Sequence, residues 1–110
     1  MTKPSFTVAV TRTADGPTVA TVTGDVDATN ATDFVSAVEA VEGERPIVVD
    51  LSPMRYFDSA GFAALDSLLS TRSVIVVLDP ASPIRRAAAL MGVPFHDTIA
   101  SARGTTLEPL

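Results

Sequence analysis

The residues of this sequence that are best suited to chemistry are polar residues that follow short apolar segments. Asp25 and Asp27 follow the first of these segments, Asp58 and Ser59 the second, and Asp79 the third. Carboxylate oxygens are ligands of hard cations such as Mg²⁺, so the aspartates could hold a metal ion beside a phosphate. A serine hydroxyl could instead accept a phosphate group from a kinase.

Most catalytic interpretations lack a second component. The sequence contains no GxGxxG, GxxxxGK[ST] or GxSxG motif and no cysteine. The one histidine, His96, stands beside Phe95, and no base is near Ser59 in the sequence. A metal-dependent phosphoacceptor would normally place a lysine beside its aspartates, and the only lysine is Lys3. We therefore expect no enzymatic activity, no cofactor and no bound metal.

Composition narrows the class of protein. The 110 residues include 46% hydrophobic residues and have a net charge of −5, which indicates a globular domain that does not attract nucleic acid or an anionic membrane. No run approaches ~18 apolar residues, the length of a membrane-spanning helix. We expect a single cytoplasmic domain over residues 1–110, with its core at about 6–99 and a short, frayed tail at 100–110 of at most one helical turn.

Alternating and helical spacing of apolar residues predicts the elements. Residues 5–13 and 18–23 alternate as half-buried strands, and the turn at Asp15-Gly16-Pro17 joins them in a hairpin. Asn30, with Asp33, resembles the cap of a helix that continues until Gly43. A further helix is expected from about Ser59 to Ser70. Another helix should open at the Ser82-Pro83 pair and run to Gly92.

Two β-branched runs, residues 46–51 and 73–78, predict buried strands, and residues 95–100 predict a weak last strand. The predicted order is β-β-α-β-α-β-α-β: an α/β fold whose mixed, mostly parallel sheet has four to five strands with helices packed against it. In parallel crossovers, the C-terminal ends of the strands lie at the same edge of the sheet. The aspartates and the serine that follow the strands should therefore gather along one edge: Asp25, Asp27, Asp58, Ser59 and Asp79.

Two short motifs resemble the signatures of a known family. Gly24-Asp25-Val26-Asp27 resembles the Gly-Glu-Leu-Asp signature of the STAS domain (sulfate transporter and anti-sigma factor antagonist). The run Val48 to Ser52, followed by Phe57-Asp58-Ser59-Ala60-Gly61-Phe62, resembles its second signature, a strand leading to Asp-Ser-Ser/Thr-Gly-Leu. The resemblance extends from about Phe6 to Ile99.

The resemblance implies a regulatory role. In bacterial anti-sigma factor antagonists, the serine after the aspartate is phosphorylated by the anti-sigma factor, which is itself a serine kinase, and a dedicated phosphatase reverses the modification. That serine corresponds to Ser59. The domain would bind the anti-sigma factor when unphosphorylated, catalyse nothing, and contact neither nucleic acid nor a membrane. The candidate partner-binding residues around Ser59 are Asp25, Asp27, Asn30, Asp58, Ala60, Gly61 and Ala63.

Three departures from the family pattern bear on the choice of partner. Ala60 replaces the usual second hydroxyl residue, Phe62 replaces leucine, and Asp25 is one methylene shorter than glutamate. Small side chains on the helix after Ser59, among them Ala63, could allow a partner to approach closely or could simply favour the helix.

Two alternatives stay open at this stage. Ser59 could be only the N-cap of the helix that follows it, because serine is a preferred capping residue. The fold could also serve another task, since STAS domains act as accessory subunits of lipid-transporting ABC systems without a phosphorylation cycle.

Overall fold

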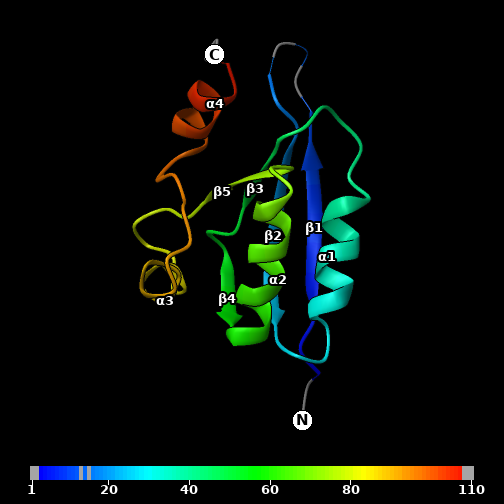
Figure 1. The fold of residues 1–110 in the computed structure, drawn as a ribbon, viewed down its shortest axis with the longest axis vertical. Helices are drawn as coiled ribbons and strands as arrows, with labels where there is room; N and C mark the ends of the chain where they lie inside the picture. Colours follow the sequence, from blue (N-terminus) through cyan, green and yellow to red (C-terminus); the bar gives the residue numbers. More distant parts are fainter. Residues whose placement is uncertain (1–2, 13, 15, 108–110) are drawn as a thin grey trace.

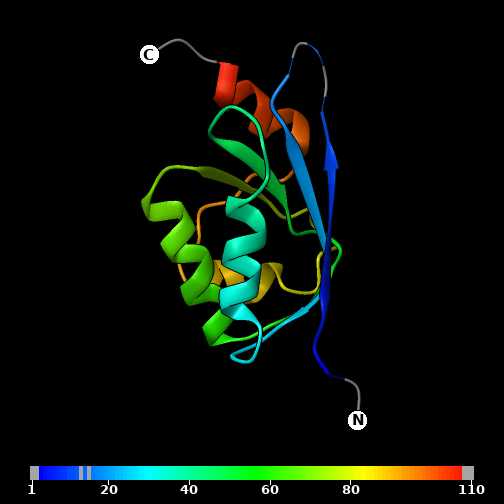
Figure 2. The ribbon, with the colours of Figure 1, turned by 90° about the vertical axis from the view of Figure 1, so that its right-hand side faces the viewer.

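A computed structural model describes residues 3–12, 14 and 16–107 of the chain, where one mixed sheet carries helices on both faces (Figures 1 and 2). This confirms the predicted single α/β domain. In chain order the elements are β1 (Phe6–Thr11), β2 (Val19–Val26), α1 (Ala31–Glu39), β3 (Ile47–Asp50), β4 (Met54–Phe57), α2 (Ser59–Ser70), β5 (Val74–Val77), α3 (Arg85–Leu90) and α4 (Ile99–Leu107).

The sheet has the strand order β1-β2-β3-β5, with β4 paired to β2. β1 and β2 form the predicted antiparallel hairpin, and the other pairings are parallel. β2 is long enough to serve two partners in turn. Its first part, residues 19–21, pairs with β3, and its last part, residues 24–26, pairs with β4. The chain thus leaves β3 and rejoins the same edge of β2 further along.

Gly24 makes this change of partner possible. The register of β2 against β4 shifts between Gly24 and Asp25, as at a β-bulge. Gly24 has a φ of +112°, and a Cβ at this position would collide with the carbonyl oxygen of Ser5. Because only glycine accepts this backbone without strain, the glycine of the motif fixes the register in which Asp25 pairs with β4.

Adjacent residues of β3 face opposite layers of the molecule. Ile47 and Val49 belong to the main core, which α1 and α2 cover with residues such as Phe34 and Leu65. Val48 points to the other face. There it packs in a smaller cluster with Val19, Val77 and Ala102, the last of which belongs to α4. The central strand is therefore buried on both faces, as its β-branched sequence predicts.

The C-terminal region differs from the prediction. The weak strand expected at residues 95–100 is wrong: His96 makes one isolated parallel bridge to Val77, and Ile99 begins α4. The frayed tail is also wrong as far as Leu107, because α4 covers residues 99–107 and buries Ala102 completely. Residues 108–110 lie outside the described part of the chain.

Two helices are shorter than predicted. α1 ends at Glu39, before Gly43 is reached. α3 begins at Arg85 because the residues before it form turns: the Ser82 hydroxyl accepts a bond from the N–H of Ile84, and the Ser82 carbonyl accepts one from the N–H of Arg85.

Candidate functional site

The ends of β2 and β4 bring the two sequence motifs together. Val26 pairs with Phe57, and the N–H of Asp58 donates to the carbonyl of Val26 at 3.3 Å. The loop between β2 and α1 and the start of α2 lie at the same end of the molecule, the lower end in Figure 1. The predicted meeting of the Asp25–Asp27 segment with Ser59 is therefore confirmed.

Asp79 does not join this group. Asp50 at the end of β3 pairs with Val77, and the N–H of Asp79 donates to the Ser52 hydroxyl at 2.9 Å. Asp79 thus lies level with the end of β3, before β4 begins. The expectation that it would share the edge with Ser59 is wrong because β4, absent from the predicted order, carries the chain further before α2 starts.

Asp58 is the N-cap of α2. Its backbone is extended, with φ −99° and ψ −171°, and its Oδ1 accepts bonds from the N–H groups of Ala60 at 3.0 Å and Gly61 at 3.1 Å. These are two of the donors that a helix start leaves without intrahelical partners. Ser59 is the first residue of the helix itself. The interpretation of Ser59 as the cap is therefore wrong.

The Ser59 side chain is exposed, and its hydroxyl makes no hydrogen bond within the part of the chain that the structure describes. A hydroxyl on an exposed first turn can be reached by the active site of another protein. Since Asp58 already occupies two of the nearby N–H groups, a phosphate on Ser59 would gain the helix dipole but would lie close to a carboxylate.

The loop between β2 and α1 is held by its own side chains. Asp27 accepts bonds from the N–H and the hydroxyl of Thr29. Asn30 accepts from the N–H of Asp27 at 2.9 Å, and its Nδ2 donates to the carbonyls of Asp25 at 3.1 Å and Pro4 at 3.3 Å. Asn30 is only 9% exposed and makes no capping bond to α1. Asn30 thus occupies the predicted N-cap position, but its side chain does not cap the helix, because the amide bonds to the backbone of Asp27, Asp25 and Pro4 instead.

Asp25 forms an ion pair with a residue outside both sequence motifs. Its Oδ2 lies 3.2 Å from Nη2 of Arg55 on β4, and the two side chains are 28% and 75% exposed, respectively. The pair lies at the surface, where an ion pair adds little to stability. The sequence motifs do not indicate Arg55, because its contact with Asp25 depends on the pairing of β4 with β2.

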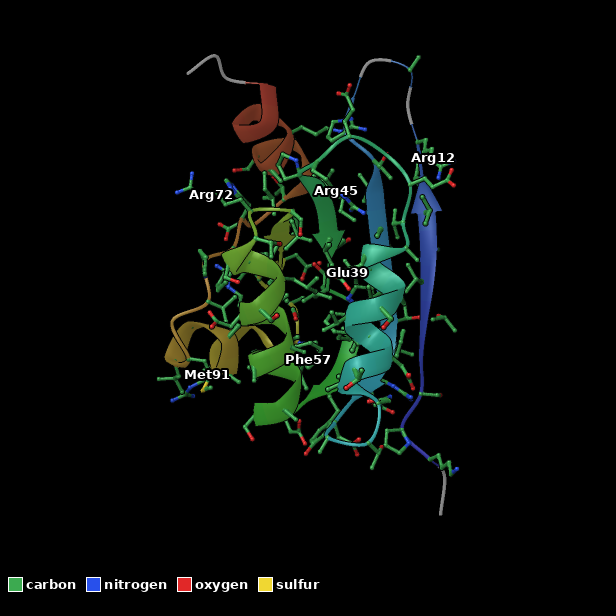
Figure 3. The ribbon with its side chains drawn as sticks, turned by 45° about the vertical axis from the view of Figure 1, so that its right-hand side comes forward. Arg12, Glu39, Arg45, Phe57, Arg72 and Met91 are labelled. Carbon is green, nitrogen blue, oxygen red and sulfur yellow. The ribbon has the colours of Figure 1, made fainter. Side chains whose placement is uncertain are left out.

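Gly61 is a packing residue. It is buried, and a Cβ built on it would lie 3.1 Å from the Phe57 ring. That ring is held edge-on between Phe34 and Phe62, with centroid distances of 5.4 and 5.1 Å, and Figure 3 shows Phe57 near the start of α2. Gly61 therefore lets α2 approach β4 closely.

The accessible part of the site is smaller than the predicted set. Ser59 and Ala63 are exposed, and the side chains of four further residues are partly exposed: Asp25, Asp27, Asp58 and Ala60. Asn30 and Gly61 are buried, so they shape this surface without forming it. These residues form a patch of acidic and small side chains, and the exposed Arg55 borders it at Asp25.

No metal site accompanies this patch. Among residues 3–12, 14 and 16–107, no three histidine, aspartate or glutamate side chains group closely enough to hold a metal ion. A cavity of about 250 Å³ lies elsewhere, lined by Val38, Glu39, Arg45, Thr71 and Ser73. Figure 3 shows Glu39 and Arg45 at the far end of the two helices from Phe57. Within the described residues, no helix is long and apolar enough to span a bilayer.

Comparisons with known proteins agree with this fold. Residues 9–94 match the sequence model of the family described as "Mlab, STAS domain". The crystal structure of an anti-sigma factor antagonist from Mycobacterium paratuberculosis superposes with a TM-score of 0.76, and the two sequences are 26% identical. The match covers 94% of this chain and 96% of that chain. A comparison with curated protein sequences gave no match.

Proposed function

Because this chain belongs to the STAS domain family, we propose that it is an anti-sigma factor antagonist controlled by phosphorylation of Ser59. The unmodified chain would bind a kinase-type anti-sigma factor through the patch around Ser59, and the modified chain would release it. The observation that carries this proposal is the exposed Ser59 hydroxyl, which has no described hydrogen bond and stands next to the aspartate that caps the helix.

Asp58 caps α2 and Ser59 does not, which supports a switch that changes binding with little effect on folding. Asp58 supplies the capping oxygen, so modification of Ser59 removes no bond that the helix needs. A phosphate adds about −1.5 to −2 charges. Those charges would stand beside Asp58 and near the acidic loop at Asp27. In water this costs little, but a partner that covers the patch would have to bury the added charge.

The accessible side chains suggest how a partner is recognised. Ala60 and Ala63 would let a partner approach the backbone of α2, while Asp25 and Asp27 would attract basic groups on the partner. The exposed Arg55 could exchange Asp25 for an acidic group of the partner at little cost to the fold. In this role the chain catalyses nothing, acts in the cytoplasm, and depends on a separate phosphatase to regenerate the binding form.

The second candidate is a STAS accessory subunit of a lipid-transporting ABC system. Two observations favour it. The description of the matching family, "Mlab, STAS domain", does not mention an antagonist. Ala60 also replaces the second hydroxyl residue of the antagonist signature. Here the same patch would bind the transporter ATPase, and Ser59 would stay unmodified.

One experiment separates the two candidates. The tagged chain is used to capture partners from its source cell, and the captured proteins are identified by mass spectrometry. Antagonist function predicts a kinase-type anti-sigma factor. With ATP, this factor should add one phosphate to the parent and to Ser67→Ala, an exposed serine on the same helix, but none to Ser59→Ala. Capture of a transporter ATPase, with no phosphate on Ser59, would overturn the proposal.

A further inference from the structure

β1 is an open edge of the sheet. It pairs with β2 on one side, and on its other side no pairing with another described residue occurs. Its sequence, Phe-Thr-Val-Ala-Val-Thr, contains no charged residue, proline or glycine. Edge strands usually carry such residues or a bulge, which stop them from pairing with other chains. The flanking residues Pro4 and Arg12 limit the open segment to β1 itself.

The opposite edge of the sheet is partly covered by the chain itself. The N–H of His96 donates to the carbonyl of Val76 at 2.9 Å, and the N–H of Leu78 donates to the carbonyl of His96 at 2.9 Å. This isolated bridge covers the outer side of β5. A short segment of the chain thus covers the end of the β5 edge, whereas no described residue pairs with the outer side of β1.

Half of the backbone groups of β1 point outward. The N–H of Asp25 donates to the carbonyl of Ser5 at 2.8 Å, and the register places Phe6 opposite Gly24. In an antiparallel pair, bonded and non-bonded residues alternate. The odd-numbered residues of β1 therefore bond to β2, while the N–H and C=O groups of Phe6, Val8 and Val10 point to the open edge.

The side chains at this edge leave an uncovered apolar position. Phe6 and Val8 pack against the main core. Val10 lies on the same face of the strand but is 44% exposed, one of the few large apolar side chains with that much exposure in the described chain. A strand added next to β1 would cover it.

We infer that β1 pairs antiparallel with β1 of a second copy of this chain, so that two sheets join into one across a twofold axis at Val8. This register sets Val8 opposite itself and Phe6 opposite Val10 of the second copy, and it satisfies the outward backbone groups of all three residues. It places an aromatic and a β-branched side chain in a cross-strand pair, which is a favourable combination.

A second copy fits this edge better than another protein strand does. About the twofold axis, β1 of one copy pairs with the identical β1 of the other, as a symmetric dimer interface requires. The uncharged strand also brings no like charges together, although the chain as a whole has a net charge of −5. The surface is separate from Ser59, which lies at the end of β4 and the start of α2, so the inference does not depend on the proposed function.

The first test measures mass against concentration. Multi-angle light scattering from the micromolar to the millimolar range should show the parent changing from the mass of one chain to that of two. Val10→Lys places a charge at the edge and should remain a monomer. Ser36→Lys adds the same charge on the exposed side of α1 and should behave like the parent. A monomeric parent throughout, or an unchanged dimer for Val10→Lys, would overturn the inference.

The second test needs no variant and so does not depend on a mutant folding. Amide hydrogen exchange of the parent is measured by NMR at low and high concentration. The N–H groups of Phe6, Val8 and Val10 should exchange rapidly at low concentration and slow at least tenfold at high concentration, while those of Thr7 and Ala9 stay protected in both. Equal exchange of the even-numbered residues at both concentrations would contradict pairing at this edge.

Discussion

α1 and α2 begin at the same end of the sheet but start differently. At α1, the side chain of the residue in the capping position, Asn30, makes no bond to the helix. It bonds instead to the backbone of Asp25, Asp27 and Pro4. At α2, Asp58 binds two N–H groups of its own helix, and the next residue, Ser59, keeps an exposed hydroxyl.

The difference separates residues that hold this surface in shape from the residue that can be modified without loss of a hydrogen bond to a described residue. The buried Asn30 amide uses both its donor and its acceptor to hold the backbone of the loop and of the end of β2. Asp58 is required by the helix. Ser59 is the residue whose polar group neither the loop nor the helix uses, and it is the one whose modification costs the fold least.

The largest effect on stability is expected from Asn30→Ala. The substitution leaves the N–H of Asp27 and two carbonyls without their partner in a partly buried place. Each unsatisfied buried group costs roughly 1–3 kcal/mol, so we expect a loss of about 2–3 kcal/mol in the free energy of unfolding. Urea denaturation measures it, with the exposed neighbour Thr32→Ala as control. Equal stability of the two variants would show that the loop does not depend on Asn30.

Asp58→Ala should have the next largest effect. It removes the capping oxygen from the N–H groups of Ala60 and Gly61, which should cost about 0.5–2 kcal/mol. Asp58→Asn keeps a capping oxygen and is the matched control, expected to stay close to the parent. Thermal unfolding distinguishes them. If Ala and Asn were equally damaging, the carboxylate charge would matter more than the cap.

Gly61→Ala should destabilise by a smaller amount, about 1 kcal/mol. Alanine stabilises a helix by ~1 kcal/mol relative to glycine, but an added methyl group in a packed site costs roughly 1–3 kcal/mol. The Phe57 ring, 3.1 Å from the new Cβ, is held between two other aromatic rings and has little room to yield. Gly104→Ala, a helical glycine with open space around it, should stabilise instead. A stabilised Gly61→Ala would show that Phe57 moves easily.

Ser59→Ala should change stability least. The Ser59 hydroxyl makes no hydrogen bond to a described residue. Its loss should therefore alter the free energy of unfolding by less than about 0.5 kcal/mol, as substitutions of other exposed residues do. A loss as large as that of Asp58→Ala in the same thermal scan would return the capping role to Ser59 and weaken the contrast between the two residues.

Much of the arrangement could be predicted from the sequence, because it follows from apolar periodicity and the handedness of parallel crossovers. These gave the hairpin, the buried β3 and β5, and the meeting of Asp27 with Ser59. β4 was missed because Arg55 and Tyr56 are polar and exposed, as in a loop. α4 was missed because, among its described side chains, the buried one is the small side chain of Ala102.

The individual roles at the site were harder to predict than its position. Asparagine, aspartate and serine all occur at helix starts, and their residue types do not reveal which of them caps. Asn30 and Asp58 could be told apart only from the hydrogen bonds that each makes in three dimensions. The same applies to Gly61, whose burial against Phe57 depends on how α2 crosses β4.

We propose that charge on Ser59 controls binding and leaves the fold intact. It is tested most directly by titrating the kinase-type anti-sigma factor with the parent, with Ser59→Asp and with Ser36→Asp, which adds the same charge on the exposed side of α1. We predict that all three unfold at similar temperatures and that Ser59→Asp alone binds at least about tenfold more weakly, because its charge must be buried by the partner. Equal affinities for the parent and Ser59→Asp would contradict the account.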